Sequence, residues 1–379
     1  MIEQVPIEEY DRLRRGTPEV HMFSASDFAD VEAPARHFHV EGLVPGHTVT
    51  TLNGDGGTGK SLLALQLAVA TVTAGRWCGL HVATGPVVYL SAEDDEAELH
   101  RRLEDIARHQ NISLSELGAL HIIALAGEDA LLATPEKGNV LKPTKLFHAV
   151  EAALARQKPA LVIIDTLADV FGGDENDRAQ ARQFVGLIRG WAIRYKCAVL
   201  LLAHPSMSGM SSGTGTSGST AWNNSVRSRL YLDRVKSNDF EADPDARVLR
   251  TVKANYGRTG GEVRMRWQDG VFVTPVDTLP TALGALAEAN RADRIFLELL
   301  ARFDAEGRYV SAHGTANNYA PTAFARHPNA DGIIKRGFQA AMDRLFLANR
   351  IEIGQSTDGP PSKRKEIIKV AQVERRADQ

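Results

Sequence analysis

The chain has 379 residues, of which 43% are hydrophobic and 24% are charged, with a formal net charge of -3. This composition is ordinary for a globular protein of one or two domains, and no apolar run approaches the roughly 18–20 residues that would cross a bilayer. The slightly acidic balance excludes a globally basic nucleic-acid binder, so any contact with nucleic acid has to come from local loops.

Residues 1–35 carry scattered charges without strong periodicity, and we expect an N-terminal arm with one short helix near residues 8–15. Such an arm is often disordered, but it can also dock on a neighbouring subunit. The polar N-terminus lacks the apolar core of a signal peptide. Cys78 and Cys197 lie in apolar stretches without CxxC spacing, which favours reduced cysteines in a cytoplasmic protein. We expect no contact with a membrane.

Residues 36–275 alternate apolar strands with helices, which predicts an α/β fold with a mostly parallel sheet covered by helices on both faces. A Gly/Ser-rich segment, residues 206–220, interrupts the order and is expected to be a mobile loop. The expected strands cover residues 47–54, 86–93, 120–126, 160–167, 198–205, 227–235 and 247–257, with a hairpin in 262–274, and the expected helices cover 61–75, 94–110, 145–157 and 178–196.

The pattern changes after residue 275. We expect a linker over residues 276–290 and a small winged-helix-like domain with a partly basic tail over residues 291–379. Such a module often binds duplex DNA, and Lys335, Arg336 and Arg344 could line one helix face. A solvated helix face or a protein-docking surface explains these side chains equally well.

Residues 54–61 read GDGGTGKS and fit the P-loop pattern G-x-x-x-x-G-K-[ST] between an apolar strand and a helix. The glycines let backbone N–H groups point at phosphate oxygens, and the helix N-terminus adds partial positive charge. We expect Lys60 to reach the β- and γ-phosphates of ATP and the Ser61 hydroxyl to ligate Mg²⁺. The flanking elements disfavour a chance glycine-rich turn. The expected nucleotide-binding residues are Gly54, Gly56, Gly57, Thr58, Gly59, Lys60, Ser61 and Leu62.

A second motif, ALVIID over residues 160–165, is an apolar strand that ends in a carboxylate, as in a Walker B motif. Ligands gather at the carboxyl ends of strands in open α/β sheets, so Asp165 is expected to hold the water shell of Mg²⁺. Thr166 follows it, so the water-activating base has to come from elsewhere. Glu93 is the best candidate, because in an adjacent strand order its carboxylate would lie beside the γ-phosphate. The alternative is an acid that stabilises a helix N-terminus.

A third polar residue, His204, ends the strand LLLAH immediately before the Gly/Ser-rich segment. A histidine there could donate or accept a hydrogen bond near the γ-phosphate and transmit its loss to the following loop. The alternative is a strand-end histidine with a purely structural partner.

Several segments occur in a characteristic order: GDGGTGKS, SAED, LVIIDTLADVFGGDEND, LLLAHPS, GSTAWNNSVRSRLYL and KANYG. Together they resemble the RepA-type hexameric replicative helicases of plasmids and phages, within the RecA/DnaB-like ATPases. The resemblance spans about residues 36–275 and implies a RecA-like core that assembles into a homo-oligomeric ring, with ATP and Mg²⁺ between subunits. It also implies catalytic roles for Lys60, Glu93, Asp165 and His204.

The resemblance further places Arg227 like an arginine finger that reaches the γ-phosphate of a neighbouring subunit, with Arg229 competing for this role. Lys253 would contact the neighbour's nucleotide, although the second basic residue of the DnaB-like Lys-x-Arg pattern is replaced by Asn255.

Residues 172–178 and 206–220 match in position the two pore loops that contact single-stranded DNA, the implied partner. A replication initiator or a primase is a further candidate partner. The first loop is acidic and the second has no Lys or Arg, whereas strong electrostatic DNA binding needs basic residues.

Two functions are therefore weighed. One is an ATP-driven DNA translocase or helicase of plasmid, phage or mobile-element replication. The other is a nucleotide-dependent binding or assembly switch without processive unwinding. A small-molecule kinase is a weaker third hypothesis, because no lid-type arginine cluster is evident.

Overall fold

The computed structural model describes residues 22–371 except for residues 30, 32, 138, 205–219, 237–240, 258, 275–281 and 357–364. The chain divides into two units, Met1–Arg36 and His37–Gln379. In the first unit, the described residues form one short 3-10 helix, η1 (Ala25–Phe28), which Ser24 caps. The helix expected near residues 8–15 lies outside the described residues, as does nearly all of the expected loop 206–220.

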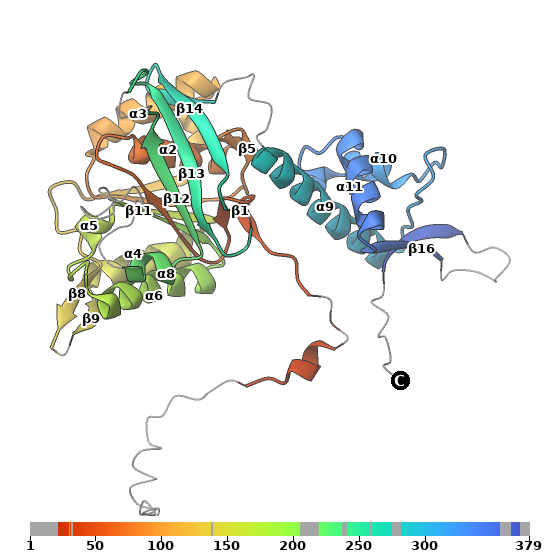
Figure 1. Ribbon diagram of the computed structural model, residues 1–379, viewed down its shortest axis with the longest axis horizontal. Coiled ribbons are helices and arrows are strands. Elements are labelled where there is room, and N and C mark those ends of the chain that lie inside the picture. The colour runs from red at the N-terminus through yellow and green to blue at the C-terminus, as the bar shows by residue number, and fades with distance from the viewer. Residues whose placement is uncertain are drawn as a thin grey trace, which may run out of the picture. The chain divides into compact units, whose positions relative to one another are not determined.

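A nine-stranded sheet forms the centre of the second unit, with the strand order β15-β14-β13-β12-β3-β11-β10-β6-β7 (Figure 1). The strands from β12 to β7 in this order are parallel, whereas β13, β14 and β15 are antiparallel additions at one edge. The predicted α/β class with a mostly parallel sheet is confirmed. The strands are β3 (Val49–Asn53), β6 (Val87–Ser91), β7 (Leu120–Ala124), β10 (Leu161–Asp165), β11 (Ala198–Ala203), β12 (Ser228–Arg234), β13 (Ala246–Ala254), β14 (Glu262–Gln268) and β15 (Val271–Val273).

The central strands are fully buried because helices cover both faces of the sheet. Successive residues of β10 point to opposite sides: Leu161 and Ile163 pack in one hydrophobic cluster, and Val162 and Ile164 pack in another. The first cluster includes side chains of α2 (Lys60–Val72) and α3 (Glu96–Gln110). The second includes side chains of α4 (Lys145–Gln157) and α6 (Arg178–Arg194). This arrangement explains why the strand sequences are continuous apolar runs.

Three of these helices have an N-cap residue whose side chain accepts a hydrogen bond from a backbone N–H group in the first turn of the helix. Asp95, Thr144 and Asp177 cap α3, α4 and α6, respectively. Smaller elements connect the main ones: β1 (Phe38–Val40), β2 (Val44–Pro45), β4 (Arg76–Trp77), β5 (Leu80–His81), η2 (Leu114–Leu117), β8 (Ala133–Glu136), β9 (Val140–Pro143), α5 (Leu167–Val170) and α8 (Thr220–Ser225).

The C-terminal part has its own hydrophobic cluster, built around Phe296, Phe324 and Phe338. Its elements are α9 (Ala282–Ala305), α10 (Ala320–Ala325), η3 (Pro328–Ala330), α11 (Lys335–Leu347) and the antiparallel pair β16 (Ile351–Gln355) and β17 (Glu366–Val370). Because α9 already begins at Ala282, much of the stretch predicted as a linker is helical. Helices followed by a β-hairpin agree with the expected order of elements, and the winged-helix assignment itself stays a prediction. None of the helices in the described ranges is long and apolar enough to span a bilayer.

Candidate nucleotide-binding site

The P-loop joins β3 to α2, and its shape depends on glycine at two positions. Gly59 has φ +94°, and a Cβ there would lie 2.5 Å from Cζ of Phe272. A Cβ on Gly54 would lie 2.5 Å from the carbonyl oxygen of Leu232. Thr58 is buried and donates its hydroxyl to the Asp55 carbonyl oxygen at 2.8 Å, which closes the loop on itself. The loop is therefore packed tightly against β12 and β15, two strands that come much later in the sequence.

A cavity of about 560 Å³ opens beside this loop, and residues from the P-loop through the start of α2 line it. Lys60 lines this cavity and donates to the Gly54 carbonyl oxygen at 2.8 Å. Burial lowers the pKa of Lys60, whereas Glu93 and Asp165 act in the opposite direction. The ammonium group is thus held in the loop as a desolvated cation, which strengthens its attraction for phosphate.

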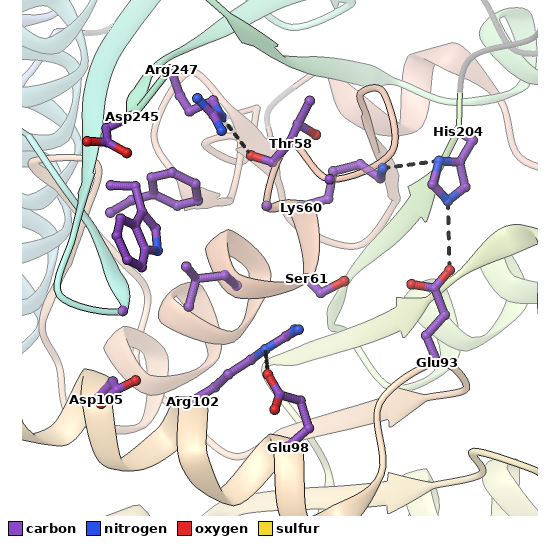
Figure 2. Close-up of a pocket in the computed structure, with 16 residues that line it drawn as sticks. Thr58, Lys60, Ser61, Glu93, Glu98, Arg102, Asp105, His204, Asp245 and Arg247 are labelled. Carbon is purple, nitrogen blue, oxygen red and sulfur yellow. Dashed lines mark hydrogen bonds and ion pairs between the residues drawn. The ribbon is translucent and has the colours of Figure 1, made fainter. Parts of the chain in front are cut away.

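His204 and Glu93 lie at one end of the same cavity, next to Lys60 (Figure 2). The Nδ1 atom of His204 is 3.3 Å from Nζ of Lys60, and its Nε2 atom is 3.7 Å from Oε1 of Glu93. The three predicted residues are therefore brought together. The expectation that Glu93 follows a strand adjacent to the P-loop strand is wrong, because β10 and β11 lie between β6 and β3. Glu93 reaches the cavity nevertheless, since it lies two residues beyond the end of β6.

Asp165 is fully buried at the end of β10, and its Oδ2 atom accepts a hydrogen bond of 2.7 Å from the Tyr89 hydroxyl. Burial raises the pKa of Asp165 to about 6, and hydrogen bonds from Tyr89 and Ser61 offset part of this rise. Its Oδ1 atom has no hydrogen-bond partner. A buried carboxylate oxygen without a partner beside the Ser61 side chain fits a role in holding hydrated Mg²⁺.

The residues described contain no group of three His, Cys, Asp or Glu side chains that could hold a metal alone. Mg²⁺ is commonly bound by one or two protein oxygens together with water and substrate phosphates. Ser61 and Asp165 would supply the protein oxygens.

Sequence reasoning predicted the strands over residues 227–235 and 247–257 and the hairpin in 262–274, but not that they support the P-loop. Arg247 of β13 donates through Nε to the Thr58 carbonyl oxygen at 3.1 Å, and the Tyr231 hydroxyl of β12 donates to Oδ1 of Asp55 at 3.0 Å. The hairpin β14–β15 adds Trp267 and Phe272 to the cavity lining. These residues follow the P-loop by more than 170 positions, and no local pattern in the sequence links them to it.

Arg227 and Lys253 do not join this cavity. The Arg227 backbone N–H donates to the carbonyl oxygen of Val49, at the start of β3, whereas the P-loop follows the end of that strand. Arg227 is exposed and Arg229 is buried, so Arg227 is the more accessible of the two competing arginines. Nζ of Lys253 donates to the Asn223 carbonyl oxygen at 2.6 Å. Burial lowers the pKa of Lys253, and the positive charges of Arg227, Arg229 and Arg189 lower it further.

The chain is similar to a solved structure and to a protein family. The crystal structure of the RadB recombinase is similar at 18% sequence identity and a TM-score of 0.43, with 61% of this chain and 91% of that chain covered. A likeness of this size carries no functional argument. The family model described as an AAA domain matches residues 16–210, which is just over half of the chain and includes both the P-loop and Asp165. The protein is therefore a P-loop ATPase that belongs to this AAA-domain family.

Proposed function

We propose that the protein is an ATP-hydrolysing DNA translocase or helicase of plasmid, phage or mobile-element replication that acts as a ring, expected to be a hexamer, on single-stranded DNA. The observation that carries the proposal is the contact of His204 with both Lys60 and Glu93 in one cavity. Glu93 would orient the attacking water, and Lys60 would stabilise charge on the transferred phosphoryl group.

His204 also provides a route from the nucleotide to the first predicted DNA loop. Glu175 belongs to that loop and is half-buried; burial raises its pKa, whereas nearby His204 acts in the opposite direction. Trp222 comes two residues after the second predicted loop in the sequence, and its indole N–H donates to the Glu175 carbonyl oxygen at 2.9 Å. A change at His204 when the γ-phosphate leaves would therefore act on a loop that is tied to α8.

The acidic side chains of residues 172–178 have structural roles in this loop. Asp177 accepts hydrogen bonds from the first N–H groups of α6, and Asp174 accepts one from the Asn176 N–H at 2.8 Å. The Glu175 pKa is raised by burial. Hydrogen bonding does not remove the negative charge of a carboxylate, so phosphate contacts at this loop would have to come from its backbone N–H groups.

A ring explains the position of Arg227 and Lys253. Both are near other cations and lie at the end of the sheet opposite to the chain's own P-loop. An anion brought by a second subunit would relieve this repulsion, as expected for an arginine that acts on a neighbour's γ-phosphate.

The ATPase rate with and without single-stranded DNA, at low and moderate salt, tests the proposal. Several-fold stimulation that weakens with salt is expected for a motor that grips phosphates. Hydrolysis that is indifferent to DNA would reject the motor and favour the assembly switch, because the site would then turn over without mechanical coupling.

A further inference from the structure

We propose, building on the ATPase function proposed above, that Trp267 forms the stacking platform for the nucleotide base and that the hairpin β14–β15 exists to place it there. The platform would lie at the end of the cavity remote from Glu93 and His204. No feature of the P-loop pattern points to this residue, because it is more than 200 positions further along the chain.

The position of Trp267 on its strand is unusual. Val263 and Met265 precede it at alternate positions of β14, and both are buried in the hydrophobic cluster that includes α2. Alternate residues of a strand share one face, so Trp267 is on this core-facing side. It is nevertheless 44% exposed, whereas Trp77, Trp191 and Trp222 are at most 2% exposed. At this point the face of the strand leaves the core and lines the cavity.

The hairpin is fixed rigidly to the nucleotide-binding helix. Phe272 pairs directly with Trp267 across the hairpin, and directly opposed residues have their side chains on the same face. The Phe272 backbone N–H donates to Gln66 Oε1 and its carbonyl oxygen accepts from Gln66 Nε2, each at 2.9 Å. At the turn, a Cβ on Gly270 would lie 2.4 Å from Oδ2 of Asp105, so the turn rests directly on α3.

The charges of the cavity give it a direction. Figure 2 shows Glu93 and His204 on one side and Asp105 and Asp245 on the other, with Ser61 between them. Phosphates are attracted to Lys60, whereas Asp105 and Asp245 at the far end are paired with Arg108 and Arg266 and offer a phosphate no free cation. Arg102 is likewise paired with Asp94 and Glu98, and Arg247 with Glu241, so the charged side chains at the far end have partners of opposite sign. An uncharged ring is the part of ATP that suits the far end.

The exposed indole of Trp267 offers such a ring a flat apolar partner. The strand that carries it is held at this residue, since the Trp267 backbone N–H donates to the Asp245 carbonyl oxygen at 2.8 Å. A preorganised aromatic platform loses little conformational entropy when a base stacks on it. Stacking of a base on an aromatic side chain changes affinity by roughly 10- to 100-fold when the side chain is truncated.

The test compares the full-length wild type with Trp267→Ala and Trp267→Phe. Binding of ADP and of inorganic tripolyphosphate is measured by calorimetry in the presence of Mg²⁺. Trp267→Ala should weaken ADP binding by on the order of 10- to 100-fold and leave tripolyphosphate binding unchanged. Trp267→Phe should keep most of the ADP affinity. Unchanged ADP affinity in Trp267→Ala, or an equal loss for both probes, would overturn the proposal.

A spectroscopic measurement gives an independent result if Trp267→Ala does not fold. Because the other three tryptophans are buried, an ADP-induced change in tryptophan fluorescence should come from Trp267 and disappear in Trp267→Phe. An identical change in that variant would count against stacking. A wild type that binds neither ADP nor tripolyphosphate would instead refute the nucleotide site itself, which separates the two failures.

Discussion

Replacement of Gly59 by alanine tests how the late hairpin and the P-loop depend on each other. Gly59 has φ +94°, a conformation that L-residues rarely adopt, and the new methyl group would lie 2.5 Å from Cζ and 2.6 Å from Cε2 of Phe272. Carbon atoms in contact prefer about 3.5–4.0 Å, so the ring has to retreat by about 1 Å or more. The two hydrogen bonds between Phe272 and Gln66 oppose that movement.

The expected cost of Gly59→Ala is the sum of two effects. A residue with a Cβ in the left-handed region costs roughly 1–2 kcal/mol. Exposure of a phenylalanine ring that is now 8% exposed costs up to about 1.5–3 kcal/mol. We therefore expect the free energy of unfolding to fall by roughly 2–5 kcal/mol and ADP affinity to fall with it, because Phe272 and Gly59 both line the cavity.

Chemical denaturation and ADP calorimetry check this expectation. Gly56→Ala is the matched control from the same loop, because a Cβ there meets no atom within 4 Å and its φ is outside the left-handed region. Its effect on stability should stay within about 0.5 kcal/mol. Gly59→Ala should also cost less in a Phe272→Ala background than in the wild type. The steric reasoning is refuted if Gly59→Ala and Gly56→Ala are equally stable.

Three further predictions concern the proposed general base Glu93, a buried histidine and the subunit interface. Glu93→Gln should still bind ATP but hydrolyse it on the order of 100-fold or more slowly in a steady-state assay, because the amide cannot accept a proton; unchanged turnover would place the base elsewhere. His39 is buried with its ring hydrogen-bonded to Thr71, and burial lowers its pKa from 6.5 to about 4. Between pH 6.5 and pH 4 only the unfolded state therefore gains a proton on this residue. The free energy of unfolding should fall by about 3 kcal/mol from pH 7 to pH 4. His39→Gln should flatten that loss in denaturation curves measured across this range, and an unaltered slope would contradict the assignment. Mixed Arg227→Ala and Lys60→Ala subunits should regain part of the ATPase activity that each loses alone, whereas no rescue would argue against an arginine acting in trans.

Much of the nucleotide site could be predicted from the sequence, because its parts are local. The P-loop pattern specifies its own loop conformation, and a run such as residues 160–165 can only be a buried strand that delivers Asp165 to the carboxyl edge of a parallel sheet. The same edge receives Glu93 and His204, so their convergence follows from topology. In this comparison only the expectation that β6 is adjacent to β3 was wrong. Glu93 still reaches the cavity, because all parallel strands end at the same edge of the sheet.

The remaining parts depend on contacts between distant segments. Nothing around Arg247, Trp267 or Phe272 signals a nucleotide, because their placement follows from antiparallel strands added at the edge of the parallel sheet. The hairpin β8–β9 escaped notice because its strands, ATPE and VLKP, each contain proline and alternate only weakly. The start of α9 was assigned to a linker because prolines precede it, although the helix begins two residues after Pro280.

The most direct test of the ATPase assignment is Mg²⁺-dependent ATP hydrolysis by the wild type and by Lys60→Ala, with circular dichroism to confirm that both are folded. Lys60 lines the cavity and is in reach of His204, so its removal should reduce hydrolysis to background while the α/β signal persists. Near-normal turnover by a folded Lys60→Ala protein would contradict the assignment of residues 54–61 as the catalytic phosphate site.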